Sequence, residues 1–147
     1  MVSDLPRRTG RCLCGKVSFT FQPAEPEVHA CHCTMCRRWS GGPRLAIKAP
    51  GPAEVVGEEF LTTYKSSEWG VRQFCSHCGT HLFFSAPAEG SGYYGVSAGA
   101  LDDLDGFALT TEIFIDRKPA LYAFANQTQQ LTEAQFLELV AAAPEQK

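Results

Sequence analysis

Long apolar runs are missing from this sequence, and so is any surplus of basic charge. No run approaches the roughly 20 residues that a membrane-spanning helix requires, and residues 1–9 contain no apolar signal core. The 13 basic residues face 16 acidic ones, for a formal net charge of −3. This balance argues against nucleic acid or an anionic membrane as a partner. We therefore expect a cytoplasmic protein that binds neither.

Linkers, long-period repeats and low-complexity stretches are absent as well. A length of 147 residues suits one domain with a substantial core. The apolar share of 44% and the charged share of 20% are those of an ordinary globular protein. We expect residues 1–147 to form a single domain.

Short segments with strand character dominate the chain and predict a mainly β fold. Apolar and polar residues alternate in 16–22 and again in 45–49, which is the period of a half-buried strand. β-Branched and aromatic residues predict further strands at 60–64, 81–84, 93–96 and 111–115. Glycine and proline clusters separate these segments.

One clear helix is expected near the end of the chain, over about 132–143. Thr132 and Gln135 have the spacing of a capping box. We expect this helix to pack against a sheet, and a partner-binding helix is the less favoured interpretation. A shorter helical turn is expected after Cys36, before the glycines at 41 and 42. The apolar positions at helical spacing are Phe136, Leu139, Val140 and Ala143.

Seven cysteines make metal binding a better explanation than disulfides. Their odd number prevents complete pairing, and spacings of one or two residues strain an intrachain disulfide. In a reducing cytoplasm such clusters more often bind metal or take part in catalysis. The cysteines are Cys12, Cys14, Cys31, Cys33, Cys36, Cys75 and Cys78.

Two of the short-spaced pairs have the pattern of a four-thiolate zinc site. They are Cys12 with Cys14, and Cys75 with Cys78. Tetrahedral zinc with bonds of about 2.3 Å holds neighbouring sulfurs roughly 3.8 Å apart, which a turn allows at these spacings. A glycine follows each pair and permits the positive φ that such a turn requires. We predict a structural zinc that joins distant segments, with His77 an exposed neighbour. Buried free cysteines are the alternative.

Cys31, Cys33 and Cys36 form a second group within six residues. Three protein ligands with a free fourth position are typical of catalytic zinc. The fourth ligand is left open between water, His32 and the thiolate of a substrate, whose pKa zinc would lower. A second structural zinc closed by His32 and a metal-free redox trio are the alternatives to catalysis.

Basic residues gather directly after this group. Arg37 and Arg38 follow Cys36, and Arg44 and Lys48 come soon after. Arginines beside an open zinc suit a substrate that carries a thiol and carboxylates. We take Arg37 and Arg38 as candidate substrate-binding residues, although a solvated charged surface would look the same.

The motifs as a set resemble a known enzyme family. They are GRCLCGKV at 10–17, CHCTMCRR at 31–38 and FCSHCGT at 74–80, followed by IDRKPALY at 115–122. In this order they are similar to the glutathione-dependent formaldehyde-activating enzymes, which are related to the centromere-protein-V domain. The resemblance covers about 10–122. It implies a mainly β, Mss4-like fold related to zinc ribbons, here with a short C-terminal helix.

The resemblance also implies a function. The positions matching Cys12, Cys14, Cys75 and Cys78 would hold a structural zinc. Those matching Cys31, Cys33 and Cys36 would hold a second, catalytic and easily lost zinc.

The implied activity is that of a carbon–sulfur lyase, an S-(hydroxymethyl)glutathione synthase that joins glutathione to formaldehyde. The alternatives are a non-catalytic carrier of glutathione or its adducts and a zinc-ribbon-like interaction module. No general acid stands out, and His32 and Glu68 are the weak candidates.

Overall fold

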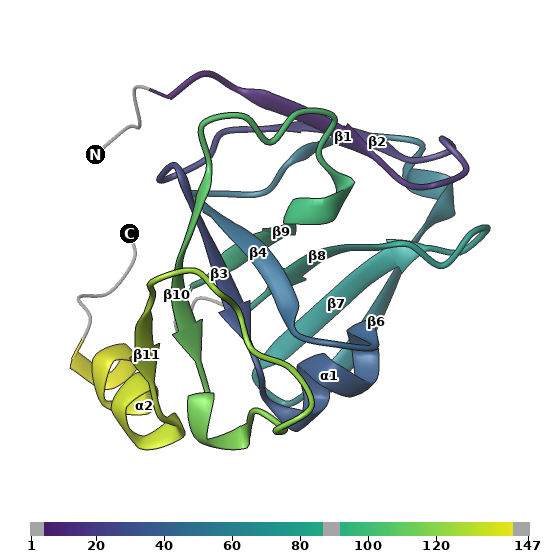
Figure 1. Ribbon diagram of the computed structural model, residues 1–147. Coiled ribbons are helices and arrows are strands. Elements are labelled where there is room, and N and C mark those ends of the chain that lie inside the picture. The colour runs from purple at the N-terminus through teal and green to yellow at the C-terminus, as the bar shows by residue number, and fades with distance from the viewer. Residues whose placement is uncertain (1–4, 87–91, 143–147) are drawn as a thin grey trace.

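The computed structural model describes residues 5–86 and 92–142, which form two β-sheets and two α-helices (Figure 1). The smaller sheet contains β1 (Arg8–Arg11), β2 (Ser18–Phe21) and β5 (Glu54–Val56). The larger sheet contains β3 (Glu27–Cys31), β4 (Arg44–Ala49), β6 (Leu61–Ser67), β7 (Gly70–Cys75), β8 (His81–Ser85), β9 (Tyr94–Ser97), β10 (Ala108–Ile113) and β11 (Gln129–Leu131). The helices are α1 (Thr34–Ser40) and α2 (Glu133–Ala142).

The larger sheet has the strand order β11-β10-β3-β4-β9-β8-β7-β6. Strand β10 lies parallel to both β3 and β11, and the other neighbours are antiparallel. The smaller sheet is antiparallel throughout and packs over the larger one (Figure 1). Because β10 follows β3 by some 80 residues along the chain, only the complete fold brings their ends together.

The hydrophobic core lies between the two sheets. Ile47, Val96 and Phe83 are cross-strand neighbours on β4, β9 and β8, and all three are buried. Residues directly opposite each other in an antiparallel pair point to the same face, so this row marks the core face of the larger sheet. Phe19 of the smaller sheet meets it, with its ring 5.1 Å from that of Phe83 in an edge-to-face contact.

The opposite face of the larger sheet is polar and aromatic. Its matching row runs through Lys48, Gly95, Phe84, Arg72 and Tyr64 on five neighbouring strands. Helix α1 covers part of this face through a single aromatic side chain. The ring of Trp39 stacks on Tyr64 and His81 and meets the edge of Phe74.

Helix α1 begins at Thr34, three residues before the start expected from the sequence. It includes Cys36 instead of following it, because the sulfur of Cys33 caps the helix by accepting a bond from the Cys36 amide at 3.3 Å. The helix ends at Gly41, as expected, where φ is 77° and the amide donates to the carbonyl of Arg37.

Helix α2 begins with the expected capping box. The Gln135 amide donates to the Thr132 hydroxyl at 3.1 Å, and the Thr132 amide donates to the Gln135 side chain at 2.9 Å. The helix packs on the short edge strand β11 and the turn at 115–117, where the Phe136 ring lies 5.6 Å from Phe114. This narrow support leaves Leu139 54% exposed, so its predicted packing role is wrong. Ala143 lies outside the described residues.

The prediction of a mainly β fold with a short C-terminal helix is confirmed. The strands predicted from alternation and composition are present, with ends shifted by one to three residues. Strands β1, β3, β5, β7 and β11 were not predicted. That residues 1–147 form one domain stays a prediction. Neither helix in the described part of the chain is long and apolar enough to cross a membrane.

Candidate metal centres and the adjoining groove

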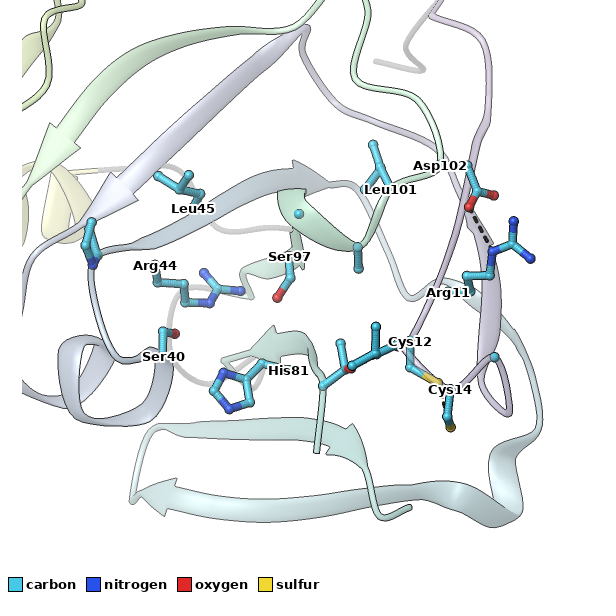
Figure 2. A pocket seen from close by; sticks show the side chains of 16 residues that line it. Arg11, Cys12, Cys14, Ser40, Arg44, Leu45, His81, Ser97, Leu101 and Asp102 are labelled. Carbon is cyan, nitrogen blue, oxygen red and sulfur yellow. Dashed lines mark hydrogen bonds and ion pairs between the residues drawn. The ribbon is translucent and has the colours of Figure 1, made fainter. Parts of the chain in front are cut away.

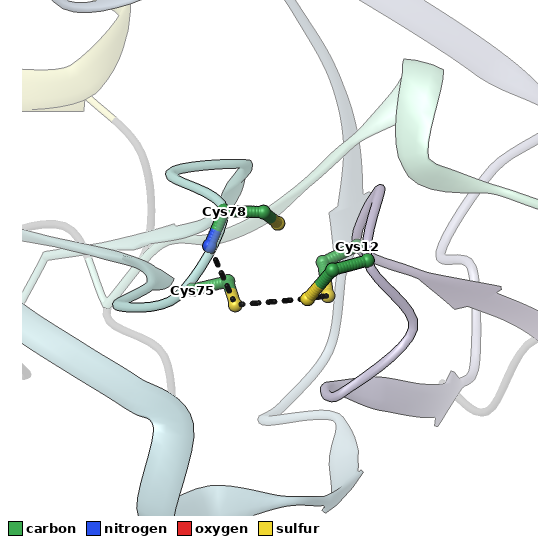
Figure 3. A group of neighbouring side chains, drawn as sticks. Cys12, Cys75 and Cys78 are labelled. Atoms are coloured by element: carbon green, nitrogen blue, oxygen red, sulfur yellow. Dashed lines mark hydrogen bonds between the residues drawn. The ribbon is translucent and has the colours of Figure 1, made fainter.

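Two turns from different sheets bring four cysteines together. Cys12 and Cys14 lie in the turn between β1 and β2, whereas Cys75 ends β7 and Cys78 lies in the turn that follows it. Figure 3 shows the sulfur atoms of Cys12, Cys75 and Cys78 meeting where these two turns approach. The group therefore joins the smaller sheet to the larger one.

The geometry of this four-cysteine group fits a tetrahedral metal. The sulfur of Cys14 lies 3.6 Å from that of Cys12 and 3.8 Å from that of Cys75. These distances agree with the roughly 3.8 Å between thiolates on one zinc ion. Gly15 and Gly79 have φ of 83° and 82°, the left-handed conformation expected of the residue after each pair.

Backbone and hydroxyl donors already point at these sulfurs. The Val17 amide donates to Cys12 at 3.3 Å, and the Cys78 amide donates to Cys75 at 3.5 Å. A hydrogen bond with the Thr80 hydroxyl lowers the pKa of Cys78 to about 5. Donors of this kind stabilise thiolates, so the surroundings suit metal ligands better than neutral thiols.

Cys31, Cys33 and Cys36 form the second group, here called the cysteine trio. Cys31 ends β3, Cys33 caps α1, and Cys36 lies in the first turn of that helix. The three sulfur atoms lie within 4.8 Å of one another. The donor set and its spacing fit a soft divalent metal held by three thiolates.

Without metal, the cysteine trio shares its charge unevenly. Hydrogen bonds from Cys31 and Cys36 lower the pKa of Cys33 far below its ordinary value of 9.0. The bond to the Cys33 sulfur raises the pKa of Cys31. For Cys36, the bond with Cys31 lowers the pKa, but Cys33 and burial outweigh it and raise the pKa overall. One thiolate and two thiols are therefore expected at pH 7.

Zinc binding to the cysteine trio should release about two protons per ion at pH 7, because Cys31 and Cys36 must both ionise. Affinity should rise about a hundredfold per pH unit, and the rise should continue to about pH 9 because both pKa values are raised. Calorimetric titration in buffers of different ionisation enthalpy measures the protons released. The titration starts from protein whose four-cysteine group already holds zinc, so that only zinc binding to the trio is measured. Release near zero would mean that all three sulfurs ionise before zinc arrives.

Arg72 is a buried cation that the sequence did not single out. It lies on β7, 3% exposed, and its two terminal nitrogens are 3.8 and 3.9 Å from the sulfur of Cys36. Its Nε donates to Ser66 at 3.1 Å, and its guanidinium lies 4.9 Å from the ring centre of Phe84. A buried guanidinium in this place favours negative charge on the cysteine trio.

His32 is turned away from metal binding. It is fully buried, and its Nε2 donates to the Glu112 carboxylate at 2.7 Å. Its Nδ1 lies 2.8 Å from the hydroxyl oxygen of Tyr122, with which it shares a hydrogen bond. Both ring nitrogens are thus engaged, and the interpretation of His32 as the fourth ligand is wrong. The histidine instead ties the end of β3 to β10 and the segment at 122.

Glu112 is held in its ionised form by this network. Burial raises its pKa, but hydrogen bonds from Thr128 at 2.6 Å and from His32 outweigh burial and lower it. The carboxylate is only 2% exposed and lies on β10, beside the parallel strand β3. Sequence reasoning did not single out Glu112, and it included Tyr122 only as the last residue of the motif at 115–122.

A groove of about 750 Å³ runs from the four-cysteine group to Arg44, the residue that pairs with Cys31 across β3 and β4 (Figure 2). Cys12 and Cys14 line one end, where Arg11 is paired with Asp102 at 3.3 Å. The other end is lined by Ser40, Arg44, His81 and Ser97. Arg44, which belongs to the basic cluster noted in the sequence, is buried, whereas His77 is exposed, as expected.

A second hollow of about 400 Å³ lies between α1 and the segment at 119–122. Arg37 and Arg38 line it together with Tyr122. The Nε of Arg37 donates to the His32 carbonyl at 3.1 Å, so part of its side chain is fixed, while Arg38 is exposed. The weak candidate Glu68 is exposed on the turn between β6 and β7.

Comparison with known proteins agrees with this arrangement of cysteines. A sequence model described as "glutathione-dependent formaldehyde-activating enzyme" matches residues 7–117, which carry both groups. The chain belongs to this family. The resemblance drawn from the motifs is therefore confirmed, and the match begins and ends close to the expected 10–122.

Relatives of this family member include curated proteins and a solved structure. A Schizosaccharomyces pombe protein, named as an uncharacterized lyase, is 33% identical over 87% of this chain and 93% of its own length. A Halomonas elongata protein named for glutathione-dependent formaldehyde activation is 32% identical over 53% of this chain and 55% of its own length. A crystal structure from Rhodobacter sphaeroides matches with a TM-score of 0.55 and 27% identity, over 64% of this chain and 87% of its own.

Proposed function

We propose that this protein is a zinc-dependent carbon–sulfur lyase that makes or breaks the adduct of glutathione and formaldehyde. The observation that carries the proposal is the geometry of the cysteine trio. Its three sulfurs lie within 4.8 Å of one another, and His32, the neighbour best placed to complete a closed site, is committed elsewhere. Three protein ligands and an open position suit catalysis rather than structure. Membership of the family and the names of its relatives support the same activity.

The two cysteine groups have different roles in this proposal. Cys12, Cys14, Cys75 and Cys78 would hold a structural zinc, and Cys31, Cys33 and Cys36 would hold the catalytic one. A zinc ion bound at the trio lowers the pKa of a thiol and so makes the thiolate nucleophile available at neutral pH.

The surrounding residues would fix and balance the catalytic group. His32 and Glu112 hold the segment that carries Cys31 and Cys33. Arg72 offsets negative charge at Cys36. Arg37 and Arg38, which line the second hollow, would contact a carboxylate of the substrate. Holding thiol and aldehyde side by side then supplies much of the rate gain.

A non-catalytic carrier of glutathione or its adducts is the second candidate. The engagement of His32 favours it, because this histidine would otherwise be the nearest side chain able to transfer a proton. A carrier would need the same binding groups and no proton donor. A cytoplasmic location belongs to both proposals, since thiol ligands stay reduced there.

Replacing Cys33 with serine tests whether the cysteine trio holds the second zinc and whether any rate gain depends on it. We expect the variant to hold one zinc per chain instead of two and to exchange formaldehyde with glutathione no faster than buffer does, because one thiolate ligand is lost. Exchange is measured by NMR with 13C-labelled formaldehyde, and zinc by elemental analysis. Met35→Leu, in the first turn of α1 but outside the trio, is the matched control and should keep both properties.

The wild-type protein decides between the candidates in the same assay. A rate above buffer that saturates with glutathione supports the lyase. Binding of glutathione without any gain in rate would support the carrier instead. One zinc per chain with three titratable thiols at the trio would contradict both zinc-based roles.

A further inference from the structure

Arg44 lies beside the cysteine trio on the polar face of the larger sheet. It begins β4 and is directly opposite Cys31 in the antiparallel pair with β3. The side chains of such a pair point to the same face, with Cβ atoms about 4.5–5.5 Å apart. Helix α1 and the loop at 41–43 lead from the trio into this arginine, so the chain itself keeps the two close.

Within residues 5–86 and 92–142, the charge of Arg44 has no acidic partner. The side chain is 9% exposed, and its contacts are a long bond of 3.4 Å to the Gly95 carbonyl and the Phe84 ring at 5.4 Å. The ion pairs of arginine within 5–86 and 92–142 involve Arg7, Arg11 and Arg117. A buried arginine is rarely left without an anion.

The free nitrogens of Arg44 reach the groove. In the described part of the chain, Ser67 Oγ is the one fully buried side-chain polar atom without a hydrogen-bond partner. The nitrogens of Arg44 that bind no protein group are therefore open to solvent, and the groove is the space that this residue lines. A cation at the wall of a concave, partly desolvated site attracts anions more strongly than one on an open surface.

Neutral hydrogen-bonding groups surround this cation. Figure 2 shows Ser40, His81 and Ser97 around the guanidinium of Arg44. Burial and the nearby charges of Arg72 and Arg44 lower the pKa of His81 from 6.5, so its ring is neutral at pH 7. The opposite end of the groove carries a compensated charge, because Arg11 is paired with Asp102.

We propose that Arg44, with Ser40, His81 and Ser97, forms a carboxylate-binding subsite for the thiol substrate. The inference rests on the proposed function and adds a binding group that the sequence placed only in a general basic cluster. Glutathione carries a carboxylate at each end and its thiol between them. With the sulfur at the cysteine trio, one carboxylate would lie at Arg44, which lines the groove, and the other would be free to reach the second hollow, which Arg37 and Arg38 line.

The test uses S-methylglutathione, which has both carboxylates but cannot offer a thiolate. Calorimetry on the zinc-loaded protein compares this probe with its diethyl ester. We expect the wild type to prefer the acid, and Arg44→Met to weaken binding of the acid by about 10- to 100-fold while leaving the ester unchanged. Arg44→Lys keeps the positive charge but loses the paired N–H donors of the guanidinium, so its affinity for the acid should lie between those of the wild type and Arg44→Met.

Arg11→Met is the matched control, because it removes an arginine from the same groove whose charge is already paired. It should bind S-methylglutathione as the wild type does. Circular dichroism and zinc content establish that each variant is folded. If Arg44→Met does not fold, the proposal is still tested by the wild-type preference for acid over ester and by the affinity of Arg44→Lys for the acid.

The proposal is overturned if the wild type binds acid and ester equally, binds neither, or loses as much affinity through Arg11 as through Arg44. This binding test can be failed or passed independently of the rate assay that tests the proposed lyase activity. Binding through Arg44 without any rate gain with glutathione would keep the subsite and reject the lyase. A rate gain with unaltered affinity in Arg44→Met would keep the lyase and reject the subsite.

Discussion

Replacing Cys75 with serine should abolish cooperative folding. Cys75 is fully buried at the end of β7, and its sulfur lies 3.8 Å from that of Cys14, on the turn of the other sheet. Structural zinc contributes about 10–16 kcal/mol in small zinc domains, and a whole domain is stable by only about 5–15 kcal/mol. Loss of one ligand therefore threatens the entire stability. Thermal unfolding followed by circular dichroism, with zinc analysis, measures the effect.

His77→Ala is the matched control for this substitution. The residue lies in the same turn, is exposed, and is outside the four-cysteine group. It should unfold at the wild-type temperature and keep its zinc. If Cys75→Ser unfolded at the same temperature as the wild type and with the same zinc content, the structural role of the group would be rejected.

Glu112→Ala should lower the free energy of unfolding by about 3–5 kcal/mol, the usual cost of removing one member of a buried polar or ionic pair. The substitution leaves His32 fully buried and deprives its Nε2 of an acceptor. It also removes the acceptor of the Thr128 hydroxyl. Denaturant unfolding of zinc-loaded protein measures the loss. Removing the exposed Glu133, which pairs with Arg117, should cost only about 0–1 kcal/mol.

The pH dependence separates the charge of Glu112 from its shape. Its pKa is lowered from 4.5 in the folded protein, so its ionised form contributes stability in full above about pH 4.5. That contribution is lost as pH falls through the lower, folded pKa. Glu112→Gln keeps the shape, so its stability difference from the wild type should shrink below pH 4.5. A difference independent of pH would mean that the charge of Glu112 has no part in the network.

The cysteine groups were predictable because their chemistry is local. Spacings of one or two residues, with a glycine after Cys14 and after Cys78, are enough to define ligand-bearing turns. The capping box at Thr132 was predictable for the same reason, since its bonds span three residues. For these two features, which depend on neighbours along the chain, the sequence pattern and the structure agree.

Arg72, Glu112 and Tyr122 were not predictable, because only the strand pairing gives them their roles. Arg72 reaches Cys36 across 36 residues, and Glu112 reaches His32 across 80. No periodicity of the isolated chain encodes the parallel pairing of β10 with β3. His32 was one candidate for the fourth ligand because its sequence neighbours are cysteines, whereas residues far along the chain orient its ring.

The two cysteine groups also differ in when they can form during synthesis. The trio is complete once residue 36 has left the ribosome, whereas Cys14 must wait 61 residues for Cys75. Five cysteines are therefore synthesised before Cys75 and Cys78, which complete the four-cysteine group. We expect early metal capture by the trio, and competition from Cys12 and Cys14 for the same ion, to be the main kinetic trap in folding.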